Sequence, residues 1–134
     1  MEKKAIEELY LGKDYNCAET TLRVLDGKYG LGIDEDGLKM VGGFGGGMGC
    51  GKTCGILCAS IVALSKQMII ERSHENPAVR ETCAALVAEF ENQLGSTECA
   101  DLKARYFHKD DGTRCLVTVE KGIAVAEGFL KEKE

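Results

Sequence analysis

The fold class follows from residues 77–94, PAVRETCAALVAEFENQL, in the second half of this 134-residue chain. Its apolar side chains recur at intervals of three and four residues, which is the spacing of one face of an α-helix. Asn76 can cap such a helix, Pro77 suits its first turn, and Gly95 can end it in the left-handed conformation. The pattern predicts a long helix with one buried face. The residues of that face are Val79, Cys83, Leu86, Val87, Phe90 and Leu94.

Helical spacing continues on both sides of this stretch. Apolar residues within 116–130 mark a last helix, which the chain enters through an Asp-Gly turn at 111–112, and residues 5–10 fit one further helical face. No segment alternates polar and apolar residues for long enough to predict a strand. The sequence therefore predicts an all-α fold, a bundle of about five helices in a single domain of residues 1–134.

A glycine-rich segment interrupts the helical pattern. Seven of the ten residues from Gly42 to Gly51 are glycine. No helix propagates through such a run, because glycine costs about 1 kcal/mol per residue relative to alanine in a helix. We expect a connecting loop that is either a tight crossing between helices or a cradle for a ligand. The candidate glycines of this loop are Gly45, Gly46, Gly47, Gly49 and Gly51.

Composition and charge restrict the classes of function. With 44% hydrophobic and 29% charged residues, the chain should fold around a core. Its formal net charge of -5 disfavours nucleic acid, because an acidic surface repels phosphates. The longest nearly apolar run, residues 55–64, is about half of a membrane-spanning helix, and residues 2–4 lead into no signal-peptide core. We expect a soluble cytoplasmic protein without membrane insertion.

Seven cysteines in so short a chain indicate metal or redox chemistry more than structural disulfides in a cytoplasmic protein. Four of them follow residues that can cap a helix, and we call these four the helix-start cysteines. They are Cys17, Cys54, Cys99 and Cys115. Their candidate caps are Asn16 in a capping box with Glu19, then Thr53, Ser96 or Thr97, and Thr113.

The first turn of a helix stabilises a thiolate through its free N–H groups and the positive end of the helix dipole. We therefore predict lowered pKa values at the helix-start cysteines. If the four helix starts gather at one end of the bundle, they form a thiolate site or two redox-active disulfides. If they pack separately, they are small hydrophobic residues.

The other three cysteines are assigned differently. Cys83 lies on the apolar face of its predicted helix, which favours core packing. Cys50 and Cys58 are possible additional thiols near Cys54, because residues four apart share a helical face. The segment 46–53, GGMGCGKT, also satisfies the P-loop pattern for nucleotide binding, but a P-loop follows a buried strand and the surrounding pattern is helical.

Several of these motifs together resemble the C_GCAxxG_C_C family of redox-active proteins. They are Asn16-Cys17-Ala18-Glu19, the glycine run ending in Thr53-Cys54-Gly55, Gly95-Ser96-x-x-Cys99, and Cys115 before the final helix. The resemblance implies a small helical prokaryotic protein whose four family cysteines are the helix-start cysteines. The chain departs from the family pattern at Ile56, where alanine is usual, and at Cys58-Ala59, where a glycine is expected.

Two hypotheses for the site stay open, a metal centre and a dithiol/disulfide centre. The resemblance favours an iron–sulfur cluster or another thiolate-bound metal, since a related domain in split-Soret cytochromes has similar cysteines associated with an iron–sulfur centre. In that hypothesis the helix-start cysteines are ligands and the glycine loop shields the centre. The sequence has no C-x-x-C-H motif for covalent haem.

The predicted partner is a redox or electron-transfer protein, and a homodimer is a further hypothesis. An alternative function is a non-catalytic metal-binding protein, or a partner module for a membrane transporter or an electron carrier. Nucleotide binding through Lys52 is a third hypothesis. No motif identifies a catalytic acid, base or substrate.

Overall fold

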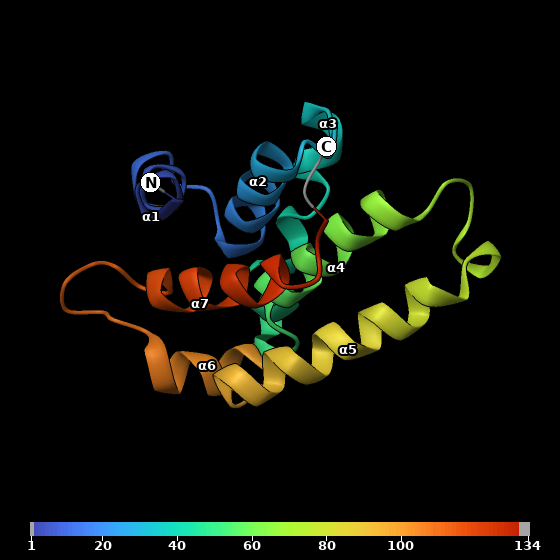
Figure 1. The fold of residues 1–134 in the computed structure, drawn as a ribbon. Coiled ribbons are helices and arrows are strands. Elements are labelled where there is room, and N and C mark those ends of the chain that lie inside the picture. The colour runs from blue at the N-terminus through green and yellow to red at the C-terminus, as the bar shows by residue number, and fades with distance from the viewer. Residues whose placement is uncertain (1, 132–134) are drawn as a thin grey trace.

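The computed structural model describes residues 2–131, and helices make up most of it (Figure 1). Those residues form seven α-helices and no strand beyond two isolated bridges, which confirms the all-α class with more helices than the predicted five. The helices are α1 (Glu2–Glu7), α2 (Cys17–Tyr29), α3 (Glu35–Lys39), α4 (Gly55–Met68), α5 (Pro77–Leu94), α6 (Cys99–Tyr106) and α7 (Leu116–Glu127). Four short turns connect them, η1 (Glu8–Gly12), η2 (Gly42–Phe44), η3 (Gly47–Gly51) and η4 (Ser73–Glu75).

Helix α5 begins and ends where its local signals predict. The Asn76 side chain accepts a hydrogen bond from the Ala78 N–H, Pro77 is the first residue, and Gly95 ends the helix with φ 95°. Val87 is an exception on the predicted face, because it is 37% exposed. The buried residues of α5 are Val79, Leu86, Phe90 and Leu94.

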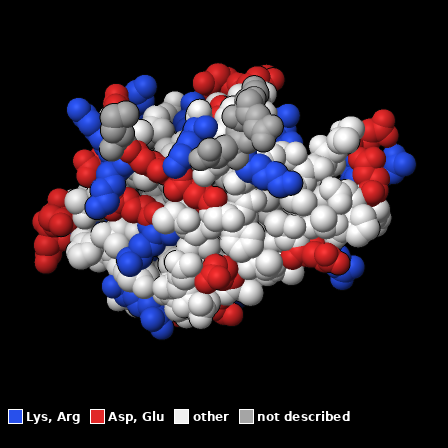
Figure 2. All heavy atoms as spheres, viewed as in Figure 1, with Lys and Arg blue, Asp and Glu red and all other residues white. Residues whose placement is uncertain are grey.

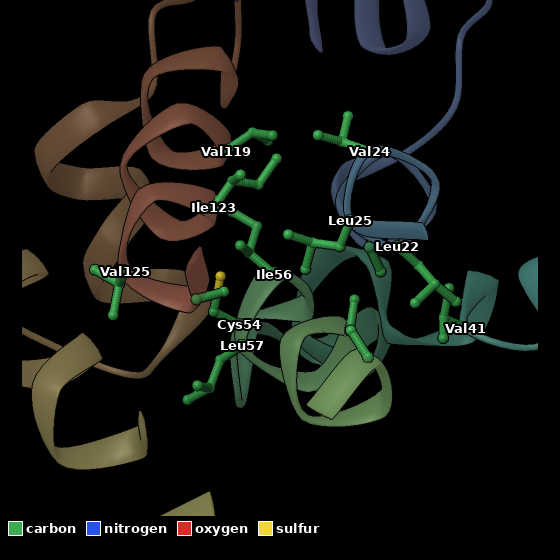
Figure 3. Close-up of a cluster of buried hydrophobic side chains, with 14 of the residues drawn as sticks. Leu22, Val24, Leu25, Val41, Cys54, Ile56, Leu57, Val119, Ile123 and Val125 are labelled. Carbon is green, nitrogen blue, oxygen red and sulfur yellow. The ribbon is translucent and has the colours of Figure 1, made fainter. Parts of the chain in front are cut away.

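The core lies where α2, α4 and α7 meet, with α5 packed along α4 and α7 (Figure 1). Figure 3 shows Leu25 of α2 and Ile56 of α4 near Ile123 of α7, and Leu22 of α2 near Val41. All five side chains are almost completely buried. Burying each of these side chains contributes about 1.5–3 kcal/mol. No described helix combines the length and apolar character needed to cross a membrane.

Charged side chains of both signs share the surface. On the face shown in Figure 2, acidic and basic residues lie side by side, without a continuous basic patch. This distribution agrees with the modest net charge of -5.

Helices α4 and α7 approach closely at Gly122. A Cβ at that position would overlap the Ile56 side chain and lie 3.1 Å from Cε2 of Phe90. Ile56 is 1% exposed. The missing side chain at Gly122 therefore makes room for the Ile56 side chain.

We expect Gly122→Ala to lower the free energy of unfolding by about 1–3 kcal/mol, because the added methyl group overpacks the α4–α7 contact. Gly27→Ala is the matched control, since a Cβ at Gly27 in α2 meets nothing within 4 Å. That substitution should raise stability by about 0.5–1 kcal/mol. Urea unfolding of the three proteins measures both effects, and equal stability of the two variants would contradict the close contact at Gly122.

Candidate functional site

The four helix-start cysteines lie at the beginnings of four different helices. Cys17 and Cys99 are the first residues of α2 and α6. Cys54 and Cys115 occupy the residue just before α4 and α7, outside the first helical turn in which they were predicted. The sequence therefore located these helix starts to within two residues.

The predicted capping box at α2 is confirmed. The Asn16 side-chain oxygen accepts from the Glu19 N–H at 2.9 Å, and the Asn16 N–H donates to the Glu19 carboxylate at 3.0 Å. The Asn16 amide group also donates to the Gly42 carbonyl at 2.9 Å. This side chain thus fixes both the start of α2 and the entry to the glycine-rich segment.

The other three predicted caps are wrong, because none of α4, α6 and α7 has a side-chain cap hydrogen bond. Thr53 pairs with Glu98 in an antiparallel bridge, and α4 has no side-chain cap. The Ser96 hydroxyl accepts from the Glu98 N–H at 3.0 Å within the turn before α6, which also lacks a side-chain cap. Thr113 bonds to Asp111 rather than capping α7. Thr97, the alternative to Ser96, supplies only its backbone carbonyl to the bridge.

The antiparallel bridge joins the starts of α4 and α6. The Cys54 N–H donates to the Thr97 carbonyl at 2.8 Å, and the Cys99 N–H donates to the Lys52 carbonyl at 2.6 Å. These backbone bonds bring together two cysteines that are 45 positions apart in the sequence.

Three of the helix-start cysteines line one surface pocket of about 490 Å³. They are Cys17, Cys99 and Cys115. Cys54 does not line this pocket; it is 4% exposed, and Figure 3 shows it among core side chains of α4 and α7. The Cys17 Sγ lies close to Gly55, the residue after Cys54, 3.1 Å from the position of an added Cβ. The four thiols therefore lie close together, with three in the pocket and one behind them.

The remaining cysteines lie apart from this pocket. Cys50 is exposed, and its thiol contacts the Gly47 carbonyl at 3.7 Å. Cys58 is half-buried on α4, and Cys83 is half-buried against the core, where it lines a different pocket on α5. Neither of the two possible additional thiols, Cys50 and Cys58, is among the residues that line the pocket of the helix-start cysteines.

The glycine-rich segment is a tight crossing beside the cysteines. Gly47 has φ 64°, and a Cβ there would lie 2.5 Å from the Cys99 Cβ. At Gly55 an added Cβ would lie 2.7 Å from the Phe44 carbonyl oxygen. Gly46 itself lines the pocket. Within residues 2–131 the strand that a P-loop requires is missing, because α3 precedes this segment.

The other candidate glycines have separate local roles. A Cβ at Gly45 would overlap the Asn16 side chain. Gly49 and Gly51 have φ 74° and 76°, a left-handed conformation that is unfavourable for residues with a side chain.

The predicted lowering of the thiol pKa values is wrong for three of the four helix-start cysteines. Burial raises the pKa of Cys17 and Cys115, and it raises the pKa of Cys54 to about 12. The expected helix-start effect is present at Cys54, because backbone N–H groups of Ile56 and Leu57 act to lower its pKa. Loss of hydration nevertheless outweighs these hydrogen bonds.

Strained backbone gathers around the pocket. Among the described residues, the non-glycine residues with positive φ are Asp14, Met48 and Arg114, at 61°, 63° and 53°. Asp14 and Arg114 line the pocket, and Met48 belongs to the adjacent turn η3. This conformation costs about 1–2 kcal/mol for a residue with a side chain. Such strain tends to cluster at functional sites.

Several residues that line the pocket were not predicted from the sequence to belong to the site, and Tyr10 is the most buried of them. Its hydroxyl accepts a hydrogen bond from the Cys115 N–H at 3.2 Å. The Arg114 guanidinium lies 4.9 Å from the centre of the Tyr10 ring, and Lys103 lines the same pocket. The available signal was a tyrosine on an apolar helical face, because a buried tyrosine hydroxyl needs a partner.

Across the part of the chain that the structure describes, no three His, Cys, Asp or Glu side chains are positioned to hold one ion. An iron–sulfur centre needs four thiolates around one small volume. Cys54 lies outside the lining of the pocket that the other three thiols share.

No curated protein and no solved structure is similar enough to the chain to count as a match. The family model described as "Putative redox-active protein (C_GCAxxG_C_C)" matches residues 15–129 and so spans all four helix-start cysteines. On this match, the chain belongs to the C_GCAxxG_C_C family.

Proposed function

We propose that this protein is a thiol–disulfide redox protein whose working groups are the helix-start cysteines. The observation that supports this most directly is that Cys17, Cys99 and Cys115 come from three helices and line one pocket. Membership of a redox-active family supports the same class. The partner is a disulfide-bearing redox protein that transfers its oxidising equivalents to this site.

The exchange balances with two protein thiols and one substrate disulfide. A pocket thiolate attacks one substrate sulfur, the substrate S–S bond breaks, and the first substrate thiolate leaves and takes up a proton. A second pocket thiol loses its proton and attacks the mixed disulfide, which releases the second substrate thiolate. The protein dithiol is oxidised to a disulfide, and the substrate disulfide is reduced to two thiols.

The pocket suits this sequence of steps better than it suits a metal. Disulfide exchange needs one accessible sulfur and a second thiol within reach, and three thiols share the pocket wall. Cys54 is 4% exposed, so a partner disulfide does not reach it directly. Its place beside Cys17 lets it exchange with a protein disulfide once one has formed.

The first test counts free thiols after oxidation. Reduced protein prepared without oxygen should present seven free thiols in denaturant, and incubation with glutathione disulfide should remove two or four of them. Dithiothreitol should restore the full count. Cys115→Ser should abolish the loss of free thiols that comes from oxidation in the pocket. Cys83 lines a different pocket, so Cys83→Ser should leave this loss of free thiols unchanged.

Iron and acid-labile sulfide are measured in the same anaerobic sample. Stoichiometric iron and sulfide, lost in Cys54→Ser, would overturn the disulfide proposal in favour of a cluster. Seven free thiols both before and after oxidation would overturn the disulfide proposal and would mean that the cysteines only pack as small hydrophobic residues.

The second test uses the pH dependence of stability. Burial raises the pKa of Cys54 from 9.0 to about 12, so above pH 9 the unfolded chain loses this proton while the folded protein keeps it. The free energy of unfolding should therefore fall as pH rises within that window, by about 1.4 kcal/mol per pH unit for each such thiol. Urea unfolding under reducing conditions, from about pH 8 to about pH 10, measures the slope.

A pair of alanine variants isolates the thiol. Cys54→Ala should flatten the pH dependence, because it removes one buried ionisable group. Ser60→Ala removes a buried hydroxyl of α4 that does not ionise, so it should keep the slope of the unmodified protein. Equal slopes in the two variants would contradict a buried, protonated Cys54.

A further inference from the structure

We propose that Cys115 is the thiol that attacks the partner disulfide, and that Tyr10 and Arg114 select it by hydrogen bonding and charge. This inference rests on the proposed function and assigns the order of its thiols. Tyr10 lies outside residues 15–129, the part of the chain that the family model matches. The family match therefore does not extend to Tyr10.

Accessibility separates the four helix-start thiols. Cys99 is 8% exposed and Cys54 is 4% exposed, whereas Cys115 and Cys17 are half-buried. An attacking sulfur must reach an external disulfide in line with its S–S bond, so the attacking thiol is Cys115 or Cys17. The surroundings of these two sulfurs then decide between them.

The Tyr10 hydroxyl is aimed at Cys115. It accepts the Cys115 N–H at 3.2 Å, which leaves its own O–H available as a donor. Tyr10 is 6% exposed, and burial raises its pKa to about 12, so the hydroxyl keeps its proton at neutral pH. Burial is the largest influence on the Cys115 pKa and raises it, while hydrogen bonding by Tyr10 acts against burial and lowers it.

Two cations favour a negative charge on Cys115. Arg114 precedes it in the chain, with the guanidinium 4.9 Å from the Tyr10 ring centre, and Lys103 reaches the same pocket from α6. Both cations act to lower the Cys115 pKa, whereas a charge on Cys99 raises it. Asp14 also lines the pocket, but its carboxylate lies 3.9 Å from the Arg114 guanidinium. Glu19 is the remaining pocket carboxylate, and it accepts the Asn16 N–H.

Cys17 lacks this support. Burial is the largest influence on the Cys17 pKa and raises it, and charges on Cys115 and Cys99 raise it further. The groups that act against burial there are the backbone N–H groups of Gly46 and Ala18. Cys17 and Cys99 are therefore suited to the second step, in which a neighbouring thiol displaces the substrate from Cys115.

The test measures the alkylation rate of each cysteine as a function of pH. Brief iodoacetamide pulses on the folded, reduced protein, followed by peptide mass spectrometry, report every cysteine separately. Cys115 should react fastest among the helix-start cysteines. Tyr10→Phe should slow Cys115 about three- to tenfold at neutral pH and move its pH midpoint upward, because one pKa unit corresponds to a tenfold change in thiolate. The exposed Cys50 should react as before.

Two further variants distinguish a specific effect of Tyr10 and Arg114 on Cys115 from a general loss of packing in the pocket. Tyr15→Phe removes a hydroxyl from a tyrosine of the same pocket that does not bond Cys115, and should leave the Cys115 profile unchanged. Arg114→Gln should shift the Cys115 midpoint in the same direction as Tyr10→Phe. Faster alkylation of Cys17 or Cys99 than of Cys115, or an unshifted profile in Tyr10→Phe, would overturn the inference.

Its failure is distinguishable from failure of the proposed function. If the Cys115 alkylation profile shifts as described but glutathione disulfide does not lower the free-thiol count, the selection of Cys115 stands and the disulfide function is wrong. If the disulfide forms but another helix-start cysteine is alkylated faster than Cys115, the disulfide function stands and the selection of Cys115 is wrong.

Discussion

The backbone pairing between residues 52–54 and residues 97–99 is the constraint on which the cysteine cluster depends. Two short hydrogen bonds, at 2.8 Å and 2.6 Å, fasten the start of α4 to the start of α6. The pairing requires close approach, because a side chain at Gly47 would collide with Cys99. Since the glycine-rich segment also receives a hydrogen bond from Asn16, the same crossing holds the start of α2 nearby. Three helices thus begin at one place because the intervening loop has almost no side chains.

Burial and the helix-start effect compete at the thiols, and burial is the larger. Backbone N–H groups act on the sulfurs of Cys17 and Cys54, which favours the thiolate. The same convergence of helices removes water, which favours the neutral thiol. The outcome at Cys54 is a pKa of about 12 despite two N–H groups that lower it. Placement at a helix start is therefore not sufficient to lower a thiol pKa; at Cys115 the cations Lys103 and Arg114 also act against burial.

Local signals in the sequence predicted most of the helices and placed four cysteines at or beside helix starts. Helix α5 follows its capping residues at both ends, and the Asn16–Glu19 box forms as expected. At the other three helix starts the prediction rested on caps that do not form, yet the cysteines still lie within one residue of the helix. Tyr10 and Arg114 could not be assigned in this way. The contacts of Tyr10 with Cys115 and Arg114 depend on how segments about a hundred residues apart pack, and no local pattern encodes that.

The mutual influence of the thiols restricts how much charge the site carries. A charge on Cys99 raises the pKa of Cys17, Cys54 and Cys115, and a charge on Cys115 raises that of Cys17. Ionisation of one sulfur therefore keeps its neighbours protonated. Disulfide exchange uses one thiolate at a time and needs the next thiol to release its proton only after a mixed disulfide has neutralised the first. Four simultaneous thiolates, as in a metal centre, would require a cation to offset this repulsion.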